Sequence, residues 1–155
     1  MEDLIRICKK YNKIAYITVR DKQIQTCVDE IFRLLEKYDM LNNCILNSFS
    51  IDTLKAIREK DANIKISCVF GPNKILTKKH VEKAAALGNC AICVFWFKDV
   101  LIAGEKLKKS AKAMQYATEK GIELHYAQSH DAEGYSFGIL SGFKAFQCST
   151  SFAFK

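Results

Sequence analysis

Short runs of β-branched and aromatic residues alternate along this chain with longer segments of helical period, and this alternation constrains the fold more than any other feature. The clearest helical segment covers residues 23–40, where apolar side chains recur at the i, i+3, i+4, i+7 spacing of one helix face. Those side chains are Ile24, Cys27, Val28, Ile31, Leu34 and Leu35. Such an alternation is typical of βα units built around a parallel sheet.

The full pattern predicts about six parallel strands and about six helices. The strands are expected at residues 14–19, 44–49, 64–70, 91–97, 122–126 and 144–148. The helices are expected at residues 2–11, 23–40, 77–87, 105–119 and 132–140, with one more carrying Ile51, Leu54 and Ile57. Ser50 and Thr77 are suitable N-caps, and Gly88, Gly121 and Gly142 follow predicted helix ends.

The chain of 155 residues is long enough to bury one sizeable core, and neither a linker nor a low-complexity segment divides it. Residues 1–155 are therefore predicted to form a single α/β domain. Six parallel strands fit either an open doubly wound sheet or a truncated, incomplete (β/α)8 TIM-barrel-like fold. The strand-to-helix junctions contain no glycine-rich phosphate loop, a motif that would have favoured the open doubly wound sheet.

The net charge of +7 favours an anionic partner such as a phosphate ester. The lysines between residues 106 and 112 alternate with apolar residues, so the solvated face of an amphipathic helix explains them equally. No basic cluster interleaved with aromatic residues indicates nucleic-acid binding. The longest apolar run, residues 91–97, is far shorter than the roughly 20 residues of a membrane span, and Met1-Glu2-Asp3 begins unlike a signal peptide, so a cytoplasmic protein is expected.

Seven cysteines lie scattered in apolar segments, which is typical of free thiols in a reducing compartment. Cys90 and Cys93 have C-x-x-C spacing, but they fall in a predicted strand, where positions three apart point to opposite faces. Zinc or redox use of this pair is a minor alternative, and no metal site is predicted.

Six segments in order resemble the glycerophosphodiester phosphodiesterases, phospholipase-C-like enzymes with a (β/α)8 barrel. Residues 17–20 (Ile-Thr-Val-Arg) are similar to the family's third-strand motif Ile-Glu-Ile-Lys, and residues 44–49 to its fourth strand, which ends in Ser-Phe. Residues 64–71 and 91–97 resemble the fifth and sixth strands. Residues 121–131 and 142–148 resemble the seventh strand, with its closing Asn-Asp, and the final Gly-Val-Asp-Gly-Ile-Ile-Thr.

This resemblance implies phosphodiester hydrolysis in glycerophospholipid metabolism with a divalent metal, Mg²⁺ or Ca²⁺. It implies His125, His130 and Asp131 as candidate catalytic residues, the latter two at a strand end where barrel enzymes place functional groups. Arg20 stands where the family has a lysine near the phosphate, and its guanidinium could bind phosphate in a bidentate manner. Thr18, Ser48 and Trp96 are candidates for the substrate pocket.

Several family elements have no counterpart here. The catalytic His-Arg-Gly of the first strand and the histidine after the second are absent, because the resemblance begins at the third strand. Thr18 replaces a metal-binding glutamate and supplies no charge for a hard cation. The resemblance therefore implies an impaired enzyme that carries no metal in this chain. Each candidate also has a purely structural alternative. His125 and Trp96 could pack in the core, and His130 could serve in a loop or as a helix cap. Arg20 could form a surface ion pair with Asp21.

Two functions remain open at the sequence level. The chain is either a divergent phosphodiesterase or a non-enzymatic module, derived from the barrel, that binds a phosphate ester or a protein. Six strands of an eight-strand plan also leave two open sheet edges, which a second copy of the chain could cover.

Overall fold

The computed structural model describes residues 1–20, 24–71, 74–95, 100–129 and 132–148. Its backbone contacts divide the chain into two compact units. Unit 1 comprises residues 1–68 and 87–89, and unit 2 comprises residues 69–86 and 90–155. That the whole chain folds as one domain stays a prediction.

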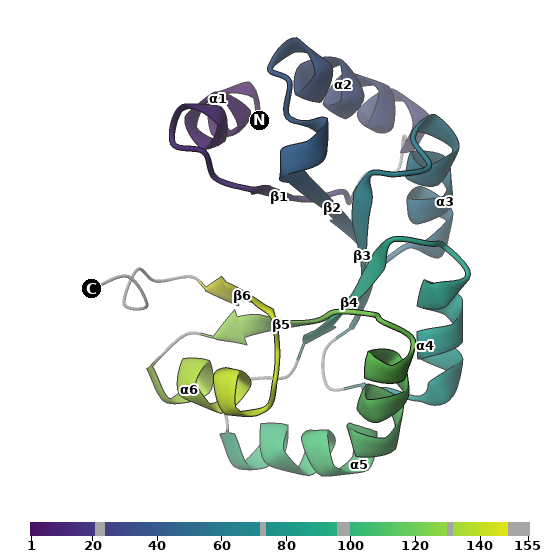
Figure 1. Cartoon of the computed structure of the whole chain (residues 1–155), viewed down its shortest axis with the longest axis vertical. Coiled ribbons are helices and arrows are strands. Elements are labelled where there is room, and N and C mark those ends of the chain that lie inside the picture. The colour runs from purple at the N-terminus through teal and green to yellow at the C-terminus, as the bar shows by residue number, and fades with distance from the viewer. Residues whose placement is uncertain (21–23, 72–73, 96–99, 130–131, 149–155) are drawn as a thin grey trace. The chain divides into compact units, whose positions relative to one another are not determined.

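In its described residues unit 1 has three α-helices, which lie on one side of its strands (Figure 1). Its elements in chain order are α1 (Glu2–Lys10), β1 (Ala15–Thr18), α2 (Ile24–Lys37), the 3-10 turn η1 (Leu41–Asn43), β2 (Cys44–Ser48), α3 (Ile51–Lys60) and the start of β3 (Lys65–Phe70). Strand β2 pairs in parallel with β1 and with β3. The predicted N-cap of α3 is confirmed, since Ser50 Oγ accepts a hydrogen bond from Thr53 N at 3.2 Å.

The two faces of the unit 1 strands carry different register rows, because successive residues of a strand point to opposite sides. Ile17, Leu46 and Ile66 lie in register and are nearly inaccessible to solvent. The other face carries the register row Thr18, Asn47 and Ser67. The row Ile17, Leu46 and Ile66 therefore belongs to the core, and the polar row lies on the opposite face.

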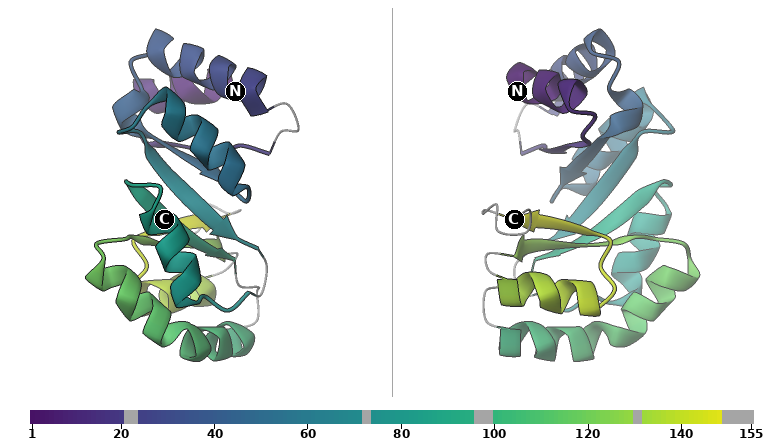
Figure 2. Two further views of the ribbon diagram at one scale, coloured as in Figure 1. Left: turned by 90° about the vertical axis from the view of Figure 1, so that its right-hand side faces the viewer. Right: turned by 60° about the vertical axis from the view of Figure 1, so that its left-hand side comes forward.

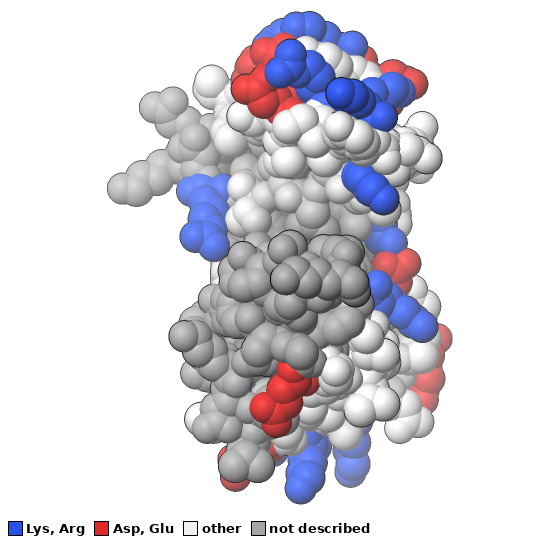
Figure 3. All heavy atoms as spheres, turned by 90° about the vertical axis from the view of Figure 1, so that its left-hand side faces the viewer, with Lys and Arg blue, Asp and Glu red and all other residues white. Residues whose placement is uncertain are grey.

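Charged side chains gather over the end of unit 1 that carries α1 and α2 (Figure 3). They are of both signs and pair with one another. Lys37 Nζ lies 2.6 Å from Glu2 Oε1, and Lys9 Nζ lies 3.0 Å from Asp39 Oδ2. The basic side chains of this surface are therefore partly neutralised by neighbouring carboxylates.

Unit 2 repeats the βα pattern (Figure 2). After the end of β3 come α4 (Lys78–Ala85), β4 (Cys90–Phe95), α5 (Val100–Glu119), β5 (Leu124–Ser129), α6 (Ala132–Leu140) and β6 (Ala145–Cys148). Strand β5 pairs in parallel with β4 and β6. The predicted start of α5 at residue 105 is wrong by five residues, because Gly104 lies within the helix and does not interrupt it.

The glycines predicted to follow helix ends do so. Gly88 and Gly121 have φ of +65° and +69°, the left-handed conformation that a residue without Cβ adopts at little cost. The predicted helix ends are therefore confirmed at these two glycines.

The two faces of the unit 2 sheet also differ. Val69, Cys93 and Ala127 form a small buried cluster on one face. On the other face the ring of Tyr126 packs 5.3 Å from that of Phe143 and 6.2 Å from that of Phe137 of α6. Tyr126 thus lies on the side of the sheet that α6 covers.

The strand order is β1-β2-β3-β4-β5-β6, the same as the order in the sequence. A doubly wound sheet reverses its strand order at a switch point, and this order has none. In the described part of the chain six parallel strands alternate with helices, two fewer than in a complete (β/α)8 barrel. The predicted incomplete TIM-barrel-like α/β fold is therefore confirmed.

Candidate functional site

A pocket of about 280 Å³ opens where β1 and β2 end and α3 begins. Its wall consists of Val19, Arg20, Ser48, Phe49, Ser50 and Thr53. All six belong to unit 1, and the sequence analysis named two of them, Arg20 and Ser48. The carboxyl ends of parallel strands are the edge at which α/β folds of this type place their sites.

Ser48 braces the pocket wall. Its side chain is buried, and its hydroxyl donates to the backbone oxygen of Val19 at 2.9 Å. Ser48 Oγ in turn accepts a hydrogen bond from the backbone N–H of Ser50 at 3.2 Å. Ser48 therefore holds the end of β1 against the turn that leads into α3, and its proton is committed to that bond.

The first turn of α3 forms the pocket's polar rim. Ser50 caps the helix through Thr53 N, and the remaining N–H groups of the first turn point out of the helix end. The helix dipole adds a partial positive charge at this end. The rim therefore favours an anion.

Arg20 brings a full positive charge to the pocket. Its side chain is exposed, and its guanidinium carbon lies 5.4 Å from the centre of the Phe49 ring. Phe49 is 42% exposed, so its ring presents a surface on which a guanidinium can rest. Over the ranges that the structure describes, no carboxylate forms an ion pair with Arg20, and Asp21 lies outside those ranges.

Thr18 is set apart from this pocket. It lies in register with Asn47 of β2, which lies in register with Ser67 of β3. Tyr16, two residues before Thr18 on the same face of β1, has its Oη 3.1 Å from Ser67 Oγ of this row. The structure thus places Thr18 in a polar row of the sheet face, while Arg20 and Ser48 meet at the strand ends.

His125 lies on β5 in unit 2 and is 2% exposed. Its Nε2 lies 3.3 Å from Glu123 Oε2. It shares a register row with Cys93, which belongs to the small buried cluster. This environment is that of a packed and partnered histidine, the alternative that the sequence left open.

The other predicted site residues, His130, Asp131 and Trp96, lie outside the described residues. Six cysteines of the described residues, Cys90 and Cys93 among them, form no disulfide bond. No group of three or more His, Cys, Asp or Glu side chains within the described ranges is placed to hold a metal ion. Within the same ranges, no helix is both long and apolar enough to cross a membrane.

The sequence analysis missed the parts of Val19, Phe49, Ser50 and Thr53 in this pocket. A signal for them was present, because Ser48-Phe49-Ser50 joins a predicted strand to a predicted helix cap. The stacking of Arg20 on Phe49 could not be read from the sequence, since the two residues lie on different βα units.

Neither a family model nor a curated protein matches this chain. Solved structures match its fold. A protein from Silicibacter pomeroyi assigned as a glycerophosphoryl diester phosphodiesterase superposes with a TM-score of 0.74 at 11% identity, over 96% of this chain and 52% of that one. A protein from Galdieria sulphuraria assigned as a glycerophosphodiester phosphodiesterase gives a TM-score of 0.74 at 14% identity, over 95% and 58%.

The PaMucR phosphodiesterase, solved in complex with c-di-GMP, gives a TM-score of 0.68 at 10% identity, over 95% of this chain and 71% of that one. The chain thus spans just over half the length of the first two structures and shares their fold. The similarity to the fold of glycerophosphodiester phosphodiesterases is therefore confirmed.

Proposed function

We propose that this chain binds a phosphate ester in the pocket at the ends of β1 and β2. The observation that carries the proposal is the meeting of the Arg20 guanidinium with the capped N-terminus of α3 around one cavity. A guanidinium can donate two parallel hydrogen bonds to phosphate oxygens, and helix N–H groups can donate others. Phe49 limits the movement of the Arg20 side chain, which lowers the entropy lost on binding.

The test measures the binding of glycerol 3-phosphate and of glycerophosphocholine to the purified chain by calorimetry, with and without EDTA. Arg20→Ala should weaken binding about tenfold to a hundredfold, the cost of losing hydrogen bonds to a charged group. Arg20→Lys should retain part of the affinity, because lysine keeps the positive charge but cannot donate two parallel hydrogen bonds. EDTA should have no effect.

Arg33→Ala is the matched control. Arg33 is an exposed arginine of α2 that pairs with Glu30 and does not line the pocket. Its replacement by alanine changes the net charge by the same amount as Arg20→Ala. Equal weakening by Arg33→Ala and Arg20→Ala would show a general attraction to positive charge and would refute the pocket.

A second candidate function is metal-dependent hydrolysis of a phosphodiester. The observation that favours it is the fold shared with proteins named as phosphodiesterases. His125, His130 and Asp131 are the proposed catalytic residues, and Mg²⁺ or Ca²⁺ is the proposed cofactor. The hypothesis is supported if a chromogenic phosphodiester is hydrolysed only in the presence of the metal and if His130→Ala abolishes this hydrolysis. If the folded protein shows no turnover, only the binding function remains.

The chain also has two strands that end the sheet order, β1 and β6. Each has a paired neighbour on one side only in the described part of the sheet, and an open edge can accept a strand from another chain. We propose self-association through these edges and a cytoplasmic location in which the cysteines stay reduced. Sedimentation analysis over a range of concentrations tests the first.

A further inference from the structure

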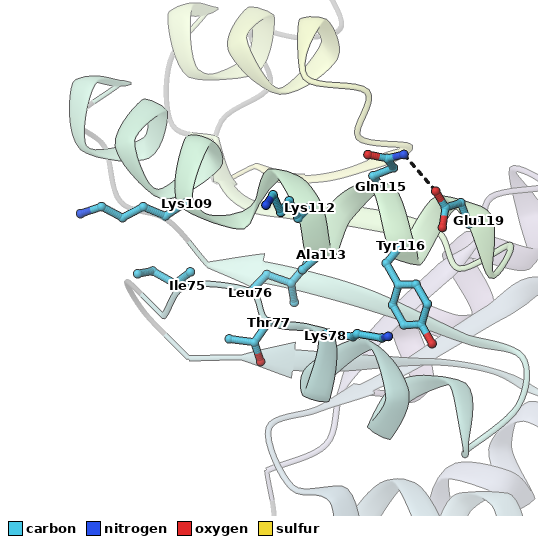
Figure 4. A pocket seen from close by; sticks show the side chains of 10 residues that line it. All are labelled: Ile75, Leu76, Thr77, Lys78, Lys109, Lys112, Ala113, Gln115, Tyr116 and Glu119. Carbon is cyan, nitrogen blue, oxygen red and sulfur yellow. Dashed lines mark hydrogen bonds between the residues drawn. The ribbon is translucent and has the colours of Figure 1, made fainter.

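Unit 2 contains a groove of about 560 Å³ between helix α5 and the segment that leads into α4. Figure 4 shows α5 along one side and the segment 75–78 along the other. The residues that line it are Ile75, Leu76, Thr77, Lys78, Lys109, Lys112, Ala113, Gln115, Tyr116 and Glu119. It shares no residue with the Arg20 pocket.

The floor of the groove is apolar and firmly attached. Leu76 and Ala113 are 2% and 6% exposed. The backbone N–H of Leu76 donates to Ser110 Oγ at 2.9 Å, and Ser110 is 1% exposed. A buried hydrogen bond therefore ties the segment before α4 to α5, so the groove is formed before any ligand arrives.

The rim of the groove is basic. Lys78, Lys109 and Lys112 contribute three positive charges against the single negative charge of Glu119, a net of +2. Glu119 Oε1 accepts a hydrogen bond from Gln115 Nε2 at 3.0 Å (Figure 4). Across the described ranges, no carboxylate forms an ion pair with any of the three lysines.

One end of the groove carries an oriented cation. Lys78 Nζ lies 4.6 Å from the centre of the Tyr116 ring, and Figure 4 shows the lysine directed toward that ring. Lys109 extends from α5 at the opposite end of the groove. Positive charge thus stands at both ends of an apolar floor.

We propose that this groove binds an organic phosphate with an apolar body. Its volume lies in the range of small-molecule pockets, about 300 to 1,000 Å³. An apolar body on Leu76 and Ala113 gains from leaving water, and a phosphate dianion can interact with more than one ammonium group. A neutral apolar molecule would leave the lysines without a partner, and inorganic phosphate would leave the floor exposed.

The probe for the test is 1-naphthyl phosphate, whose own fluorescence reports binding through its anisotropy. The naphthyl group should lie on the floor and the phosphate near the lysines. Lys112→Glu should weaken binding about tenfold, because it replaces an attraction by a repulsion. Lys108→Glu is the matched control, since Lys108 is exposed on the same helix and makes the same charge change outside the groove.

Two more comparisons decide the outcome. Ala113→Leu fills the floor and should weaken 1-naphthyl phosphate severalfold while leaving inorganic phosphate unchanged. Arg20→Ala should remove only binding at the pocket of the proposed function and leave the binding that Lys112→Glu weakens in place, which separates the two sites. Equal weakening by Lys108→Glu and Lys112→Glu, or no binding of 1-naphthyl phosphate to the wild-type chain, would overturn the proposal.

Discussion

The guanidinium of Arg58 lies against the backbone of Gly88, with Nη2 2.6 Å from the Gly88 carbonyl oxygen. The same side chain donates to four further carbonyl oxygens, at distances from 2.6 to 3.1 Å. They belong to Asp61, Ala62, Ile64 and Leu87. One arginine of α3 therefore satisfies carbonyl groups in two separate turns of unit 1.

Arg58→Lys should lower the free energy of unfolding by about 2 kcal/mol, because an ammonium group cannot reach all five acceptors. Urea denaturation followed by circular dichroism measures this. Arg33→Lys should change it little, since the Arg33 pair with Glu30 is exposed. A loss in Arg33→Lys as large as that in Arg58→Lys would contradict the role given to Arg58.

Two helical glycines of unit 2 should respond in opposite directions to alanine. A Cβ at Gly138 of α6 would collide with the ring of Phe146 on β6. Gly138→Ala should therefore cost about 1 to 3 kcal/mol of stability. A Cβ at Gly104 of α5 meets nothing within 4 Å, so Gly104→Ala should stabilise by about 0.5 to 1 kcal/mol. Thermal unfolding of both variants tests these two expectations. A change in stability of the same sign in both variants would contradict them.

His80 should make stability depend on pH. Its ring stacks on Phe70 with centroids 4.3 Å apart, and its Nδ1 accepts a hydrogen bond from Thr77 N at 3.2 Å. Burial, helped by Lys74, Lys83 and Lys79, lowers the pKa of His80 below 6.5. The unfolded chain then binds the proton more tightly, so this contribution is complete above pH 6.5 and is lost as the pH falls through the lowered pKa.

His80→Gln supplies the comparison, because glutamine can accept the same hydrogen bond but does not titrate. The difference in unfolding free energy between the wild type and this variant, measured at about pH 7.5 and about pH 5, should shift against the wild type at the lower pH. A difference that does not change with pH would show that His80 titrates alike in both states.

Phe49 should support the binding of phosphate by Arg20 without touching its charge. Phe49→Leu keeps an apolar side chain but removes the ring face, so the affinity for glycerol 3-phosphate should fall about twofold to fivefold. Calorimetry against the wild type measures this. Affinity that stays at the wild-type level would show that the ring does not position the guanidinium.

Most secondary structure could be predicted from the sequence. The period of α2 and the caps at Ser50 and Thr77 are local signals, and local signals place elements. The start of α5 was misplaced because Gly104 has a low helix propensity, which the surrounding helix overrides. Of the site, Arg20, Ser48 and Thr18 all came from the family resemblance. Arg20 and Ser48 lie at strand ends around the pocket, whereas Thr18 lies on a different part of the sheet.

The sequence by itself determined the alternation of strands and helices, because hydrophobic period records which face of each element is buried. Only the tertiary structure decided which distant groups meet. Arg58 and Gly88 are thirty residues apart, and Leu76 and Ser110 are thirty-four. Such contacts depend on strand order and register, which set the path of the backbone, and no local pattern of side chains encodes that path.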